Sequence, residues 1–181
     1  MFRIDRELSE KERSSGCECG GRLHSARYRR KPRCGVDLEQ LDPDYAVRFS
    51  YCCDRDGCRR RRTPPSVRFL GRRVYTGAVV VLIAVLAEGA TPRRLRRLRQ
   101  LVGDVSRRTV ERWRRWWRET FPQTSFWREH RARFAVAIET ERLPASLLER
   151  MPGAARARLV ALLRWLTPIT TTSAGPPAHA S

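Results

Sequence analysis

Lysine is almost missing from this chain, in which only Lys11 and Lys31 are lysines and nearly all of the 38 basic residues are arginines. Acidic residues number 19, and the formal net charge at pH 7 is +19. A field of this sign concentrates polyanions, and arginine offers a planar fork of donors that matches phosphate or guanine. Codon bias in a GC-rich genome would also explain the arginine excess, but not the net charge. We therefore expect a nucleic acid partner, with an anionic membrane surface as the second choice.

Long hydrophobic runs are also scarce. The longest apolar run covers residues 78–87, whereas a transmembrane helix needs roughly 20 apolar residues, so a buried helix explains this run better. The polar N-terminus lacks the pattern of a signal peptide. We expect no membrane span and a cytoplasmic, nucleoid-associated location. Clustered cysteines in that reducing compartment indicate metal binding rather than disulfides.

Groups suited to catalysis are few. The chain has three histidines, and its acids after Thr120 are scattered, with no strand pattern around Glu129, Glu139, Glu141 or Glu149. A nuclease or transposase fragment would need clustered acids or a Cys/His pair. The sequence therefore predicts a binding protein rather than an enzyme.

The six cysteines all fall within residues 16–62. Two pairs stand at predicted turns, the first followed by Gly20 and Gly21, and four thiolates close a tetrahedral zinc site with no open position for catalysis. A segment with so few apolar side chains would fold poorly without such a metal. We predict a structural zinc ion in a small β zinc ribbon, with ligands Cys17, Cys19, Cys53 and Cys58.

Several alternatives to this ligand set stay open. Cys52 competes with Cys53, although Cys53 continues the alternation set by Tyr51 in the apparent half-buried strand 45–53. In that strand Arg48 and Ser50 would face outward. His24 is an alternative ligand, Cys34 is expected to be a free thiol, and unliganded thiols or a redox site remain as other readings of the cluster.

Residues 72–120 show the pattern of a helix-turn-helix. A first helix is predicted over 72–88, a second begins at Thr91 and Pro92, and a third covers 106–120. Val110, Trp113 and Trp117 form its buried stripe, so the opposite face is outward and basic. The N-terminal part of such a helix contacts base edges in the DNA major groove. The residues predicted to contact bases are Arg107, Arg108, Glu111, Arg112 and Arg115. An ordinary basic helix pair in a bundle is the alternative.

Two arginine-rich stretches are suited to phosphate contacts, which give affinity without sequence information. One follows the second cysteine pair, and the other lies on the helix that would cross the DNA backbone. The predicted contacts are Arg59, Arg60, Arg61, Arg62, Arg93, Arg94 and Arg97. A solvated charge run is the alternative for each.

The predicted organisation is mainly α-helical with a small β region at the N-terminus. Aromatic residues after 115 are spaced as a helical core, although stacking on unpaired bases is an alternative for them. The boundaries are a disordered or weakly helical lead 1–15, the zinc ribbon 16–62, a linker 63–71, the helix-turn-helix domain 72–120, C-terminal helices 121–167 and a disordered tail 168–181.

The order of these parts resembles a known family. A cysteine pair, a strand ending in a second pair, an arginine-rich exit and the sequence VSRRTVERW are similar to the N-terminal DNA-binding portion of bacterial insertion-sequence transposases and their accessory proteins. The resemblance covers roughly residues 16–120 and implies zinc at the four cysteines and binding of element ends by the helix from Ser106. It also implies a catalytic recombinase or transposase subunit as a partner.

The function expected on these grounds is sequence-specific binding of double-stranded DNA in connection with a transposable element. A transcriptional regulator or an RNA-binding zinc ribbon is the alternative. A helix whose side chains contact base edges suits DNA better than RNA, because the major groove of A-form RNA is too deep and narrow for side chains to enter. A homodimer on a palindromic site is compatible with the sequence, although no heptad seam supports it.

Overall fold

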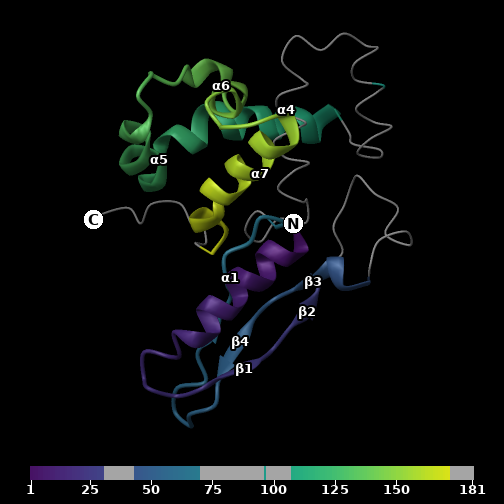
Figure 1. Ribbon diagram of the computed structural model, residues 1–181, viewed down its shortest axis with the longest axis vertical. Coiled ribbons are helices and arrows are strands. Elements are labelled where there is room, and N and C mark those ends of the chain that lie inside the picture. Colours follow the sequence, from purple (N-terminus) through teal and green to yellow (C-terminus); the bar gives the residue numbers. More distant parts are fainter. Residues whose placement is uncertain (31–42, 70–95, 97–106, 172–181) are drawn as a thin grey trace.

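The computed structural model describes residues 1–30, 43–69, 96 and 107–171. In Figure 1 the strands lie at one end, helices α4 to α7 lie at the other, and α1 runs between them. Helices with a small β region are what the composition predicts. Most of the first two helices of the predicted helix-turn-helix, with Arg93, Arg94 and Arg97, falls outside the described residues, as do Cys34 and Ser106.

The chain begins with a 13-residue helix, α1 (Phe2–Ser14). Asp5 in its first turn and Lys11 and Arg13 in its last turn complement the helix dipole. Of the two expectations for residues 1–15, disordered or weakly helical, the structure has the helix. This helix has a partner surface, since the Phe2 ring lies 5.6 Å from that of Phe49.

Two small antiparallel sheets follow. One has the strand order β1-β4-β5 and the other pairs β2 with β3. Leu23 pairs with Cys53, and Tyr51 pairs with Arg62, so the cysteine-bearing strand is central. The elements are β1 (Leu23–Ser25), β2 (Tyr28–Arg29), a 3-10 turn (Pro43–Ala46), β3 (Val47–Arg48), β4 (Tyr51–Cys53) and β5 (Arg61–Arg62).

The predicted single strand 45–53 is therefore two strands in different sheets. The expectation that Arg48 and Ser50 face solvent is also wrong, since they are 1% and 0% exposed. The physical reason is that both faces of this segment are covered. Phe49 lies against α1, while Arg48 donates to the Pro64 carbonyl at 2.7 Å from the returning chain.

The described end of the predicted linker 63–71 is buried. Ser66, Val67, Arg68 and Phe69 are each at most 1% exposed. Val67 belongs to the same hydrophobic core as Trp113 and Trp117. This stretch therefore joins the N-terminal strands to the C-terminal helices by burial rather than by a solvated connection.

The C-terminal part is a compact set of helices around an aromatic core, as predicted. Thr124 caps α5, because its side chain accepts a hydrogen bond from the Trp127 backbone N–H. Phe121, Phe126 and Trp127 are buried. The elements are α4 (Arg107–Arg115), a π-helical turn (Trp116–Thr120), α5 (Ser125–His130), α6 (Ala145–Glu149), α7 (Ala155–Trp165), and 3-10 turns at Phe121–Gln123, Arg131–Arg133, Thr140–Arg142 and Thr167–Thr170.

The beginning of the predicted disordered tail is part of this body. Thr170 is 5% exposed, and its hydroxyl accepts a hydrogen bond from the Ser66 backbone N–H at 3.0 Å. Residues 172–181 lie outside the described part of the chain.

Candidate metal centre and nucleic-acid interface

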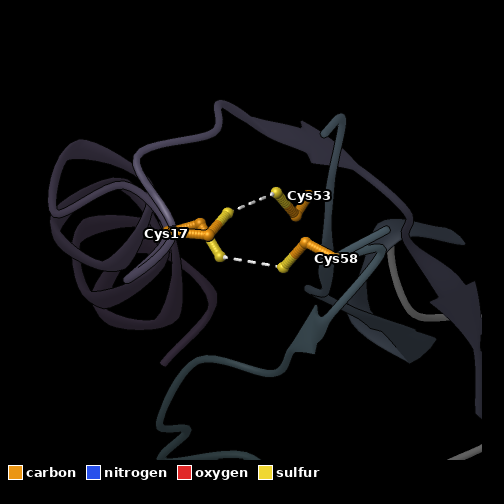
Figure 2. Close-up of side chains that lie close together, drawn as sticks. Cys17, Cys53 and Cys58 are labelled. Carbon is orange, nitrogen blue, oxygen red and sulfur yellow. Dashed lines mark hydrogen bonds between the residues drawn. The ribbon is translucent and has the colours of Figure 1, made fainter. Parts of the chain in front are cut away.

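Four cysteine sulfurs gather at one end of the three-stranded sheet. The Sγ atoms of Cys17, Cys19, Cys53 and Cys58 all lie within 4.8 Å of one another. Cys17 and Cys58 are 3.7 Å apart, and Cys19 and Cys53 are 3.4 Å apart (Figure 2). A tetrahedral zinc–thiolate site with bonds of about 2.3 Å places its sulfurs about 3.8 Å apart. The donor set and its spacing therefore fit a four-coordinate zinc ion.

The first pair reaches this geometry although only one residue separates its cysteines. The Gly20 N–H donates to the Cys17 carbonyl at 2.8 Å, and the Cys17 N–H donates to the Gly21 carbonyl at 3.2 Å. Gly20 has a φ of +82°, a conformation that side chains other than glycine rarely adopt. The turn folds both sulfurs to one side.

The second pair lies across β4 and the turn that follows it. The Cys53 N–H donates to the Arg60 carbonyl at 3.0 Å, and the Cys58 N–H donates to the Arg55 carbonyl at 3.1 Å. Gly57 permits this turn with a φ of +84°. The four intervening residues thus form a closed loop that returns Cys58 to Cys53.

The two turns are joined to each other by polar contacts. The Arg22 backbone N–H donates to the Asp54 carboxylate at 2.8 Å, and the Arg55 guanidinium donates to the Cys19 carbonyl. The four-thiolate set would carry net negative charge even with a divalent cation. Nearby arginines favour that charge.

The thiols have unequal acidity before any metal binds. A backbone hydrogen bond from Gly21, with help from the Cys53 thiol, lowers the pKa of Cys19 to about 6. The Arg55 backbone N–H lowers the pKa of Cys53, but desolvation and the neighbouring thiols outweigh it and raise that pKa to about 12. Cys19 is thus largely a thiolate at neutral pH, and a metal ion must displace protons from Cys53 and from Cys58, whose pKa is also raised.

The structure separates the ligand alternatives. Cys53 is in the cluster, whereas the Cys52 thiol donates to the Arg59 carbonyl at 3.4 Å. His24 is not in the cluster, and its ring lies 3.3 Å from the Asp54 carboxylate. The preference for Cys53 over Cys52 is therefore confirmed as to position.

Three of the four arginines in the run 59–62, which follows the second cysteine pair, form ion pairs with acidic side chains of the protein. Arg60 and Arg62 each lie 2.5 Å from the Glu18 carboxylate, and Arg62 also contacts Glu12 at 3.1 Å. The hydrogen bond to Glu12 raises the pKa of Arg62 further. Arg59 pairs with Asp56 at 2.8 Å.

Arg61 is placed differently from its neighbours. Its guanidinium donates to the Ala26 carbonyl at 3.3 Å and lies over the Tyr28 ring at 5.5 Å. Its charge is therefore not offset by an acid among the ion pairs of the described residues. Within the run, Arg61 is the best placed for a phosphate.

Helix α4 has a buried and an exposed face. Trp113, and Trp117 in the π-helical turn that follows, are 1% and 0% exposed and pack in the C-terminal core. Val110, predicted for the same buried stripe, is only half-buried. The five residues predicted to contact bases are all exposed: Arg107, Arg108, Glu111, Arg112 and Arg115. Arg107 and Glu111 form an intrahelical ion pair at 2.9 Å, which leaves three arginines on this face outside that pair.

One structural feature, a buried ion pair, has no signal in the sequence. Asp5 and Arg68 form a fully buried ion pair at 2.8 Å, 63 positions apart in the chain. Neither residue belongs to a motif, and Asp5 stands among other charged residues of α1.

No family model, curated protein or solved structure matches this chain. Among the described residues, no helix combines the length and apolar character that a bilayer span requires.

Proposed function

We propose that this protein is a zinc-containing, sequence-specific binder of double-stranded DNA that serves a transposable element as an accessory or non-catalytic component. The observation that carries the proposal is α4, a helix in which Trp113 is buried while Arg108, Arg112 and Arg115 are exposed. Such a helix presents guanidinium forks that can each bond the O6 and N7 acceptors of guanine.

The metal part of the proposal rests on the cysteine cluster. Cys17, Cys19, Cys53 and Cys58 would hold a structural Zn²⁺, because four sulfurs 3.4 to 3.7 Å apart in their close pairs match tetrahedral thiolate coordination. The metal would supply folding free energy rather than chemistry. The four cysteines are not joined by disulfides and are free thiols.

Phosphate contacts would add affinity without specificity. Arg61 is the described residue of the 59–62 run whose charge faces no acid in the ion pairs above, and Arg93, Arg94 and Arg97 remain part of the same proposal. A catalytic recombinase or transposase subunit and a second copy of this chain are the protein partners that this function calls for.

The deciding experiment is selection from a randomised duplex library with zinc-loaded protein near physiological salt. Recovery of a defined motif is the expected result, and a palindromic motif would indicate a dimer. Tight, strongly salt-dependent binding without any motif would show a general polyanion binder and remove the base contacts from the proposal. Equal or tighter binding to single-stranded or hairpin RNA would favour the RNA alternative.

A further inference from the structure

The stretch 66–69, with all four side chains buried, lies between α1, the N-terminal strands and the C-terminal core. Its contacts determine whether the cysteine cluster and α4 belong to one folding unit or to two. If the two units were independent, destabilising one would not change the stability of the other. Units that share buried polar contacts unfold together instead.

Asp5 is the centre of the contacts on the α1 side. Its carboxylate accepts hydrogen bonds from the Ser66 hydroxyl at 2.5 Å, the Val67 N–H at 2.7 Å and Arg68 Nε at 2.8 Å. Every one of these groups is buried. A buried carboxylate left without these donors would be costly, so α1 and 66–69 hold each other in place.

Arg68 extends the same junction to the strands. Its guanidinium donates to the carbonyls of Asp44, Tyr45 and Val47. It also lies over the Phe2 ring at 4.7 Å and the Phe69 ring at 5.0 Å. One side chain thereby connects α1, the turn before β3 and the returning chain.

On its other side the stretch enters the tryptophan core. Val67 packs with the buried set that contains Trp113 and Trp117. The Ser66 N–H donates to the Thr170 hydroxyl at 3.0 Å, and Ile4 of α1 packs against the same core. The core that positions α4 is thus built partly from N-terminal residues.

The cysteine cluster is tied to α1 in turn. Cys17 follows the end of α1 closely, the Ser9 hydroxyl lies 2.5 Å from the Tyr51 hydroxyl two residues before Cys53, and Glu12 contacts Arg62 at 3.1 Å. If the thiolates lose their common metal, the two cysteine turns lose one of their links and keep the polar contacts of Arg22 with Asp54 and of Arg55 with Cys19. The docking of α1 on the strands weakens with the loss of that link.

We infer that the cysteine cluster and the tryptophan core form one cooperative unit joined by Asp5 and Arg68, so that metal occupancy controls the stability of α4 and hence DNA affinity. The inference rests on the proposed zinc site and DNA-binding helix. The inference adds a coupling between zinc binding and DNA affinity that the proposed zinc site and DNA-binding helix do not require. A chain with two independent domains would bind zinc at one and DNA at the other, with no effect of one on the other.

The tryptophans make this testable in the full-length protein. All five lie between residues 113 and 165, so their fluorescence reports the C-terminal core and not the cysteine cluster. Urea unfolding is followed by tryptophan emission with zinc-loaded protein and after removal of zinc by a chelator. The expected result is a lower urea midpoint without zinc, and the same midpoint from circular dichroism in each state. Duplex binding should weaken on chelation in parallel.

A cysteine inside the cluster and a cysteine outside it give matched variants. Cys19→Ser removes a ligand and should lower the tryptophan midpoint to that of the chelated protein, with no further response to chelator. Cys52→Ser changes a thiol outside the cluster and should keep the wild-type midpoint and response. Zinc content is measured for each variant in the same preparations.

The junction itself is tested by a double-mutant cycle. In an Asp5→Asn background the shift caused by Cys19→Ser should shrink, because the link between the two regions is broken. Ser9→Ala with Tyr51→Phe is the milder background if Asp5→Asn gives no folded protein. Bound zinc with an unchanged tryptophan midpoint on chelation would overturn the coupling alone, whereas a protein that binds no zinc would overturn the proposed metal site as well.

Discussion

A methyl group added at Gly21 would lie 2.5 Å from the Cys53 sulfur. It would also stand 3.0 Å from atoms of Asp54 and Arg55. Real Cβ atoms do not approach other atoms so closely, so this glycine sets how near the two cysteine turns can come. Gly21→Ala should therefore push Cys53 away from Cys19 and weaken zinc binding.

The measurement is competition for zinc against a chromogenic chelator, with an expected loss of at least about tenfold in affinity. Gly57→Asn is the matched control, because Gly57 has φ +84° but open space around its Cβ position, and asparagine tolerates that backbone conformation. Equal zinc affinity in Gly21→Ala and Gly57→Asn would contradict the proximity argument.

Zinc affinity should fall as the pH is lowered from 8 to 6. The lowered pKa of Cys19, about 6 against an ordinary 9.0, makes this ligand mostly a thiolate at pH 8 and about half a thiolate at pH 6. The pKa of Cys53 is raised to about 12 and that of Cys58 is raised as well. These two thiols must lose their protons when zinc binds, so at pH 7 binding should release at least about two protons. Titration calorimetry in buffers of different ionisation enthalpy counts them.

In the metal-free protein, the pKa shifts of Cys19 and Cys53 change stability in opposite directions as the pH changes. The depressed pKa of Cys19 contributes stability above its ordinary 9.0 that is lost as the pH falls toward 6. The raised pKa of Cys53 contributes stability below 9.0 that is lost as the pH rises toward 12. In the zinc titration, a proton release near zero at pH 7 would contradict the pKa values assigned to Cys53 and Cys58.

Local patterns in the sequence were sufficient for the first cysteine turn and for α4. Gly20 and Gly21 mark a turn that brings Cys17 and Cys19 together, and the spacing of Trp113 and Trp117 indicates which side of α4 is buried. The meeting of the two cysteine pairs, 34 and 41 positions apart in their close contacts, was predicted instead from the preference of zinc for four thiolates.

Burial by residues that are distant in the sequence could not be predicted in the same way. Alternation along 45–53 indicates one buried face, but the returning chain covers Arg48 and Ser50 as well. Asp5 looks like any acid of a charged helix until Arg68, 63 positions away, is brought against it. The prolines before Ser66 are typical of a linker, yet they precede four consecutive buried residues.

Asp5→Asn should destabilise the protein by about 3–5 kcal/mol, because it leaves the Arg68 charge buried without its carboxylate. Both side chains are 0% exposed, so water cannot replace the lost partner. Glu7→Gln on the same helix is the control. Its ion pair with Arg3 spans 3.7 Å between side chains that are 58% and 90% exposed, which limits its worth to about 0.5 kcal/mol. Chemical unfolding of both variants gives the comparison, and similar losses would contradict the role of Asp5.

Arg61 and Arg62 should respond differently in DNA binding. Arg61→Ala is expected to reduce the slope of log K against log salt by about 0.9, the contribution of one phosphate contact. Arg62→Ala removes contacts to Glu12 and Glu18 and should mainly lower thermal stability. Fluorescence anisotropy over a salt series, together with thermal melts, distinguishes the two. A larger slope change in Arg62→Ala would show that the Glu18 pairing gives way to phosphate.

Arg108→Ala and Arg112→Ala should each cost about 1–3 kcal/mol in binding to the selected duplex and relax the preference at one base position. Both side chains are exposed on α4, so neither substitution should change the tryptophan core. Arg156→Ala is the matched control, since Arg156 is an exposed arginine on α7 and carries the same charge. If the two α4 variants lose no more affinity than the Arg156 variant and keep the selected motif, α4 does not contact bases. The charge of the chain would then act as a sequence-independent attraction for polyanions.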